Sequence, residues 1–340
     1  MISLACIALL VLFDFSNGFN DTANMIATAV ASRAMTPAQA IIVVSSFTFL
    51  GPVLGGTAVA DTVGTFVHLT DLPAMNAILT IASAAAGAVT LNLLVWWRGL
   101  PSSSTHALVG ALSGAVMAAA GADHVVWGWQ SMVRDGHLHG VMLIVAALFL
   151  SPLAGLAMGW SVHRLLRLLL RRATPAARGT LNRMQWLGVA SLAFSHGAND
   201  AQKTMGVITL VLLLGGSLTR FDVPFWVILL CACSITLGTA LGGWRIIRTV
   251  GFGIYKLRPI HAFSSQLTAT AVIGTAAAFG GPVSTTHVVS SGIMGVGAAD
   301  RPRSVRWSKA AEIVFTWLIT LPAAGGLAIV FHAILARLLP

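Results

Sequence analysis

Residues 195–206 read SHGANDAQKTMG, and apolar sequence lies on both sides of them, WLGVASLAF before and VITLVLLLGG after. Both flanks suit the interior of a membrane, yet the stretch between them is polar. It holds a carboxylate, an ammonium and two amides, on Asp200, Lys203, Asn199 and Gln202. An ionisable side chain inside a membrane is costly and usually marks an ion or substrate pathway. The stretch therefore predicts a polar site inside a membrane protein.

The composition supports a membrane protein for the whole chain. Of the 340 residues, 56% are hydrophobic and 9% are charged, and the mean hydropathy is +0.86. A soluble domain needs far more charge to cover its surface. The net charge of +10 is gathered in a few short loops, which is typical of membrane topology signals, so we expect no nucleic-acid partner. We predict an all-α polytopic membrane protein in a lipid bilayer.

Hydropathy predicts about ten membrane spans, since a spanning helix needs about 20 apolar residues. They lie near residues 4–31, 38–59, 74–97, 101–120, 140–161, 184–213, 224–244, 261–279, 282–298 and 309–338. The linker 162–183 holds six arginines, and positive residues favour the cytoplasmic side. We therefore predict a multi-pass protein of the cell (inner) membrane with both termini outside the cytoplasm.

The two halves of the chain repeat one another. Three motifs recur in the same order: GFNDTAN (18–24) as GANDAQK (197–203), LGGTAVADTVG (54–64) as LGGWRIIRTVG (241–251), and PSSSTH (101–106) as PVSTTH (282–287). Each half has five predicted spans, an odd number, so the second copy enters the membrane from the opposite side. Inverted repeats are typical of secondary transporters. We predict a first repeat at 1–161, a basic cytoplasmic linker at 162–183 and an inverted repeat at 184–340.

The two Asn-Asp motifs are the first candidate site. A carboxylate at the centre of a spanning helix costs roughly 2.5–3.5 kcal/mol on insertion scales, so Asp21 and Asp200 are expected to be functional. Gly18 and Gly197 precede them by three residues and predict a local break that frees backbone groups to bind ions. The alternative is a structural hydrogen bond between helices, which the duplication of the motif disfavours.

The two Pro-Ser/Thr motifs predict broken or re-entrant helices. Proline suits the first turn of a helix, so the hydroxyls behind it lie at a new helix N-terminus. Unpaired N–H groups and the helix dipole favour an anion there, although ordinary capping is an alternative. The hydroxyl residues are Ser103, Ser104, Thr105, Ser284, Thr285 and Thr286. His106 and His287 end the motifs and either relay protons or bond to their own turn; Asp14 and Glu312 receive no role.

Hydroxyl and N–H donors facing carboxylates suit a tetrahedral oxyanion that carries its own proton. Phosphate near neutral pH keeps hydroxyls that can donate to Asp21 or Asp200, whereas sulfate has none, which mildly favours phosphate. A sulfate permease and a passive anion channel stay open as alternatives. An intramembrane hydrolase using Ser104 with His106 is disfavoured, because an enzyme needs one active constellation and this chain duplicates every polar element. We expect no enzymatic activity, no cofactor and no resident metal.

These motifs resemble those of the inorganic phosphate transporter (PiT) family, which carries GAND-x-x-N near the start of each half and P-[IV]-S-[ST]-[TS]-H further along. The resemblance covers essentially the whole chain and points to the bacterial low-affinity carriers. It implies uptake of inorganic phosphate by cation symport through an inverted-repeat homodimer. The residues it carries over for substrate binding are the hydroxyl residues above together with Asn20, Asp21, Asn24, Asn199 and Asp200.

One residue departs from that pattern. Lys203 stands where sodium-coupled members carry asparagine. An ammonium there could occupy a cation site, which predicts coupling to H⁺ rather than Na⁺, with Asp21, Asp200 and Lys203 as the titrating groups. The alternative is a fixed Asp200–Lys203 pair, which the i,i+3 spacing permits. The resemblance also admits phosphate carried as a complex with Mg²⁺ or another divalent metal.

Overall fold

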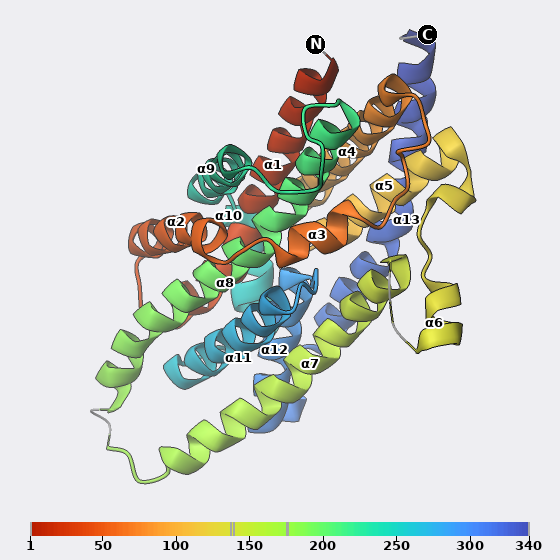
Figure 1. Cartoon of the computed structure of the whole chain (residues 1–340). Helices are drawn as coiled ribbons and strands as arrows, with labels where there is room; N and C mark the ends of the chain where they lie inside the picture. Colours follow the sequence, from red (N-terminus) through yellow and green to blue (C-terminus); the bar gives the residue numbers. More distant parts are fainter. Residues whose placement is uncertain (1, 137, 139, 175–176, 339–340) are drawn as a thin grey trace.

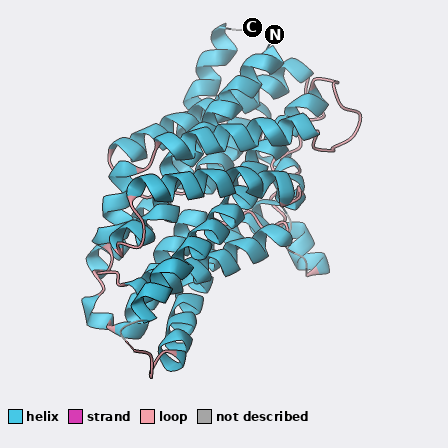
Figure 2. Ribbon diagram, turned by 90° about the vertical axis from the view of Figure 1, so that its left-hand side faces the viewer, coloured by secondary structure: helices cyan, strands magenta, loops and turns pink. Residues whose placement is uncertain are grey.

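A computed structural model describes residues 2–136, 138, 140–174 and 177–338, and these are almost entirely helical (Figures 1 and 2). In chain order the α-helices are α1 (Ile2–Ala31), α2 (Pro37–Leu54), α3 (Ala58–Gly64), α4 (Ala74–Trp97), α5 (Ser104–Ala120), α6 (Trp129–Asp135), α7 (Gly140–Leu169), α8 (Ala177–Leu214), α9 (Phe225–Leu241), α10 (Trp244–Ile247), α11 (Pro259–Ala278), α12 (Thr285–Asp300) and α13 (Trp307–Leu338). A π-helical turn, Arg248–Phe252, follows α10.

The helices confirm the predicted class of fold. Each of the ten predicted spans overlaps a helix of 16 residues or more, and within the described ranges α1, α2, α4, α7 and α13 are long and apolar enough to cross a membrane. Large apolar side chains such as Phe149, Leu153, Phe315 and Leu318 are exposed along α7 and α13, as expected for helices that face lipid. Helices α7 and α8 extend into the basic segment 162–183.

Both ends of the chain lie at one end of the molecule, and the connection from α7 to α8 lies at the opposite end (Figure 1). Figure 2 shows the same arrangement from the side. This placement agrees with the predicted even number of crossings. The orientation of these two ends in the membrane stays a prediction.

Helices of each half pack against helices of the other half. Helix α1 packs on α9 of the second half, and α8 packs on α2 of the first. A Cβ atom added to Gly18 in α1 would lie 2.1 Å from the Ile235 carbonyl oxygen, and one added to Gly197 in α8 would lie 2.4 Å from the Thr48 carbonyl oxygen. Equivalent contacts at equivalent positions are what two copies of one unit would make.

The same glycines correct one prediction. We expected Gly18 and Gly197 to break their helices, but α1 and α8 run without interruption through both motifs. The glycines instead remove the side chain where two helix backbones approach each other, and helix α9 or α2 fills the space. No freed backbone group is available for an ion there.

Helices α5 and α12 occupy equivalent places in the two halves. Helix α5 packs on α4 and α13, and α12 packs on α7 and α11. Gly110 of α5 lies against the Leu321 backbone of α13, and Gly295 of α12 lies against the Leu156 backbone of α7. These contacts hold the two helices so that their first turns meet the motifs of α1 and α8.

Candidate functional site

The first turns of α5 and α12 begin where the proline motifs predicted them. Ser103 and Ser284 are the N-cap residues, and their hydroxyl oxygens accept hydrogen bonds from the backbone N–H of His106 (3.2 Å) and of His287 (3.3 Å). Both serines therefore cap their helices, and their role toward an anion stays a prediction. Their hydroxyl hydrogens remain free to donate elsewhere.

Asp21 of α1 meets the hydroxyl motif of the opposite half. Its Oδ1 accepts hydrogen bonds from Asn24 Nδ2 at 2.7 Å and from Thr286 Oγ1 at 2.9 Å. Asn24 Nδ2 also lies 2.8 Å from Thr286 Oγ1, so the three side chains form a closed triangle. The GFNDTAN motif of the first half and the PVSTTH motif of the second thus build one site.

Lys203 of α8 joins three motifs. Its Nζ donates to Asp200 Oδ1, to Thr105 Oγ1 at 2.6 Å and to the Val283 carbonyl at 3.0 Å, which uses all three of its hydrogens. Thr105 comes from PSSSTH and Val283 from PVSTTH. The predicted ion pair between Asp200 and Lys203 exists, and it also binds both helix starts.

Thr285 connects the two aspartates. Its Oγ1 lies 3.0 Å from Asp200 Oδ2 and 3.4 Å from Asp21 Oδ2, although a hydroxyl has only one hydrogen to donate. Asp21, Asp200 and Lys203 are each at most 2% exposed, so this central cluster is closed from both faces of the protein. Ser104 stands beside it as the first residue of α5 and is 7% exposed.

Asn20 and Asn199 anchor the cluster to its surroundings. Asn20 Nδ2 donates to the Asn92 carbonyl of α4 at 3.1 Å, and Asn199 Nδ2 donates to the Gly281 carbonyl at 2.9 Å. The side-chain oxygens of these two residues and of Asn24 are buried and lack a hydrogen-bond partner among the described residues. Three carbonyl oxygens are therefore available to a cation or to a protonated anion.

His196 belongs to this site and was missed. Its Nδ1 lies 3.3 Å from Asp200 Oδ2, and ligand atoms of Asp21, His196 and Asp200 all lie within 4.8 Å of one another. This trio could hold a metal ion. The available signal was the i,i+4 spacing between His196 and Asp200, which places both on one face of a helix.

The motif histidines contact each other across the two halves. The ring centroids of His106 and His287 lie 4.6 Å apart, and the His287 ring stacks on Trp317 at 3.8 Å. Both rings line a largely apolar cavity of about 620 Å³ between α7 and α13. The two alternatives for these histidines were proton relay and a hydrogen bond to their own turn. In the structure it is the backbone N–H of each histidine, not its ring, that bonds to its own turn.

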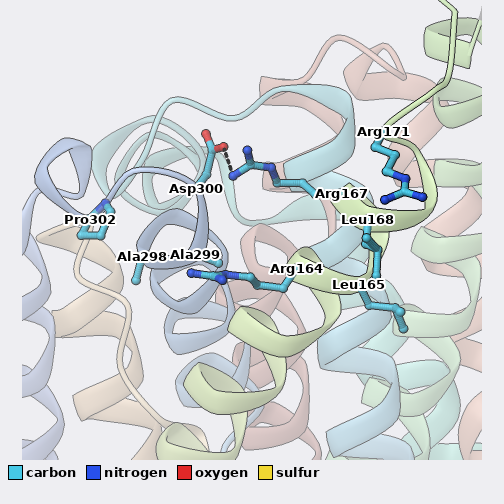
Figure 3. A pocket seen from close by; sticks show the side chains of 9 residues that line it. All are labelled: Arg164, Leu165, Arg167, Leu168, Arg171, Ala298, Ala299, Asp300 and Pro302. Atoms are coloured by element: carbon cyan, nitrogen blue, oxygen red, sulfur yellow. Dashed lines mark ion pairs between the residues drawn. The ribbon is translucent and has the colours of Figure 1, made fainter.

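A second polar cluster lies around Asp300 at the end of α12. Arg167 of α7 and His261 of α11 each lie 3.3 Å from its carboxylate, and the Tyr255 hydroxyl donates to it at 2.8 Å. Burial and the neighbouring carboxylate raise the pKa of Tyr255 to about 12. Figure 3 shows the Arg167–Asp300 pair beside a cavity of about 800 Å³, with Arg164 and Arg171 also lining it. Nothing in the sequence motifs indicated this cluster, which ties α7 to α11 and α12.

A buried charged cluster where helices of both halves of the chain meet is typical of the class of secondary transporters. Comparison with known proteins names the family: a model described as "Phosphate transporter family" matches residues 17–182 and again residues 169–328. The chain belongs to this family. Its relatives are transporters, so the chain is a transporter and not an enzyme.

Curated relatives resemble the chain over most of its length. A probable low-affinity inorganic phosphate transporter of Bacillus subtilis (strain 168) is 39% identical over 95% of this chain and 94% of its own. One from Rhizobium meliloti (strain 1021) is 39% identical over 94% and 92%. One from Mycobacterium tuberculosis (strain H37Rv) is 41% identical over 92% and 72%.

A solved structure has the same fold. It is titled "The sodium-dependent phosphate transporter", and it superposes with a TM-score of 0.81 at 25% sequence identity. The match covers 99% of this chain and 100% of that one.

Proposed function

We propose that this protein imports inorganic phosphate across the cell (inner) membrane by symport with H⁺ in preference to Na⁺. The observation that carries the proton proposal is the position of Lys203. Its ammonium lies in the central cluster with its three hydrogens on Asp200, Thr105 and the Val283 carbonyl. A fixed positive charge at this place repels Na⁺, whereas a proton can be taken up by a carboxylate already present.

The donors suited to phosphate stand at the two helix starts. The hydroxyls of Thr285 and Thr286 contact the aspartates, and the Thr105 hydroxyl contacts Lys203. Ser104 begins α5, where the N–H groups of the first turn lie. The phosphate oxygens that remain protonated can donate to Asp21 and Asp200. Sulfate carries no such hydrogen and would be repelled by both carboxylates, so we propose phosphate as the substrate.

The charges of the cluster support coupling to a cation. Two carboxylates and one ammonium leave one net negative charge, and phosphate adds at least one more. Oxygen atoms of Asp21 and Asp200 lie no more than 4.8 Å apart, where two full charges repel by at least about 3 kcal/mol at an effective dielectric constant near 20. Phosphate binding therefore favours uptake of a proton by Asp21 or Asp200, beside the Lys203 ammonium.

Two observations each favour a different co-transported ion. The unpartnered oxygens of Asn20, Asn24 and Asn199 would suit Na⁺, and the similar solved structure is named sodium-dependent. The trio of Asp21, His196 and Asp200 would suit a divalent ion that enters as a complex with phosphate. Both versions use the same closed cluster and differ in the co-transported ion.

The proposed assembly rests on the family resemblance, and the proposed topology rests on the distribution of basic residues. We propose a homodimer with both termini outside the cytoplasm, built from repeats at 1–161 and 184–340 around the linker 162–183. The basic residues of that linker support its cytoplasmic side.

Uptake of labelled phosphate into proteoliposomes tests the function. Inward pH and Na⁺ gradients are imposed separately, each with and without Mg²⁺, and the membrane potential is clamped. We expect accumulation under the pH gradient alone. Accumulation that requires Na⁺ would overturn proton coupling, a strict requirement for Mg²⁺ would establish the metal complex, and no accumulation under any gradient would overturn symport.

A further inference from the structure

A third carboxylate is buried in α1 outside the central cluster. Asp14 is 0% exposed and precedes Asp21 by seven residues, which is about two helical turns on the same face. The sequence motifs assign it no role. Its depth in a spanning helix makes it a candidate for transport chemistry.

Asp14 has almost no compensation for a negative charge. Thr204 Oγ1 donates to its Oδ1 at 3.0 Å, and its Oδ2 has no hydrogen-bond partner among the described residues. No ion pair within the described part of the chain includes it, and the hydrogens of the nearby Lys203 are committed to other groups. Asn17, one turn further along α1, is 1% exposed and has neither its amide oxygen nor its amide nitrogen partnered.

An ionised carboxylate in this environment costs several kcal/mol, and one hydroxyl together with the Ile235 backbone does not offset that cost. The groups that act on Asp14 are Thr204, Asp200 and Lys203 of α8 and the Ile235 backbone of α9, and Asp14 in turn acts on Cys231 of α9. A hard metal cation takes six or more oxygen ligands, and these neighbours do not supply them. A proton needs only the free oxygen of the carboxylate itself.

The position of Asp14 links it to the central cluster without placing it in contact with the substrate donors. Its hydrogen-bond donor, Thr204, follows Lys203 directly in α8, and the charges of Asp200 and Lys203 act on it. Three buried carboxylates and one ammonium would leave two net negative charges before phosphate arrives. A proton on Asp14 removes one of them without occupying any group at the helix starts.

We propose that Asp14 binds one of the protons that enter with phosphate. This inference rests on the proposed proton symport and gives one proton a site distinct from the phosphate-binding cluster. When phosphate binds, Asp14 is protonated, and when phosphate leaves toward the cytoplasm, the proton leaves with it.

The Asp14→Asn variant tests the proposal in proteoliposomes with the membrane potential clamped at zero. Each coupled proton supports about a tenfold accumulation of phosphate per unit of pH gradient. We expect the variant to accumulate roughly tenfold less phosphate than the wild type at one pH unit, while it still exchanges internal for external phosphate at equal pH. Asp14→Glu, which keeps an ionisable group, should recover the accumulation.

Two results would overturn the inference. One is full accumulation by Asp14→Asn beside a coupled wild type. The other is loss of both phosphate exchange and phosphate accumulation in Asp14→Asn, which would make Asp14 a structural residue. A wild type that shows no pH-driven uptake would remove the proton symport itself and this inference with it.

Infrared difference spectra provide a readout that does not depend on the asparagine variant folding. Phosphate added to the wild-type protein should produce a carboxylic-acid C=O band. The band should shift in Asp14→Glu, because the protonated group is then a different side chain. A phosphate-induced band that is identical in the two proteins, or no band in the wild type, would show that Asp14 does not receive the proton.

Discussion

Replacement of Lys203 by asparagine is the perturbation most informative about coupling. The substitution removes an ammonium that contacts Asp200, Thr105 and the Val283 carbonyl and leaves Asp200, which is 0% exposed, without its cation. Removal of one partner of a buried ion pair costs about 3–5 kcal/mol. At roughly 2 °C per kcal/mol for a large domain, the melting temperature should fall by about 6–10 °C in buffer without Na⁺.

The same change creates a place for a cation. Asparagine is shorter than lysine, so it vacates the place of the ammonium beside Asp200 and supplies a carbonyl oxygen to the space left, in a site that also holds the unpartnered oxygens of Asn20, Asn24 and Asn199. A ligand present at about 100 times its dissociation constant stabilises by about 2.7 kcal/mol. NaCl should therefore raise the melting temperature of Lys203→Asn by roughly 5 °C relative to choline chloride at equal ionic strength.

The assay is thermal unfolding of the detergent-solubilised protein, followed by labelled phosphate uptake under a Na⁺ gradient. The double variant Asp200→Asn with Lys203→Asn is the matched control. It removes both charges, so its melting temperature should lie nearer the wild type than that of either single variant, and NaCl should not change it. The reasoning fails if Lys203→Asn melts like the wild type, or if NaCl stabilises the wild type equally.

Other predictions concern the site, the packing and the substrate. Asp21→Asn and Asp200→Asn should each abolish phosphate accumulation while the protein still inserts in the membrane, and near-normal uptake by both variants would refute their assigned roles. Gly18→Ala should lower the free energy of unfolding by about 1–3 kcal/mol, because its Cβ would lie 2.1 Å from the Ile235 carbonyl oxygen, whereas Gly326→Ala meets nothing within 4 Å and should have little effect. Equal thermal stability of these two glycine variants would contradict the close packing of α1 on α9. Excess unlabelled sulfate should leave labelled phosphate uptake largely unchanged, and strong competition would favour the sulfate alternative.

Sequence reasoning predicted the helix starts well because their signals are local. A proline followed by serine and threonine acts within a single turn, and α5 and α12 begin at Ser104 and Thr285 with capping serines before them. The glycine prediction failed for the opposite reason. Gly18 and Gly197 weaken a helix when considered alone, but packing against a neighbouring backbone holds α1 and α8 straight.

Local sequence patterns could not predict which residues of the site contact each other. Asp21 and Thr286 are 265 residues apart in the chain, and Lys203 and Thr105 are 98 apart, yet each pair is hydrogen-bonded. The motifs indicated which residue types would gather but not which hydroxyl would meet which carboxylate. His196 and Asp14 went unassigned because both lie outside the duplicated motifs. Only the structure shows that His196 is buried beside Asp200 and that Asp14 is buried beside Thr204.

By itself the sequence determined that this is an all-α membrane protein of two repeated halves with polar clusters in both, since hydropathy and duplicated motifs are properties of the chain alone. Only the tertiary structure decided that the clusters merge into one closed site, with Lys203 joining both helix starts and Asp14 left without a countercharge. The reason is physical: apolar burial selects the spanning segments wherever their partners lie, whereas hydrogen bonds and charge compensation depend on ångström distances that the packing of α1, α8, α5 and α12 sets.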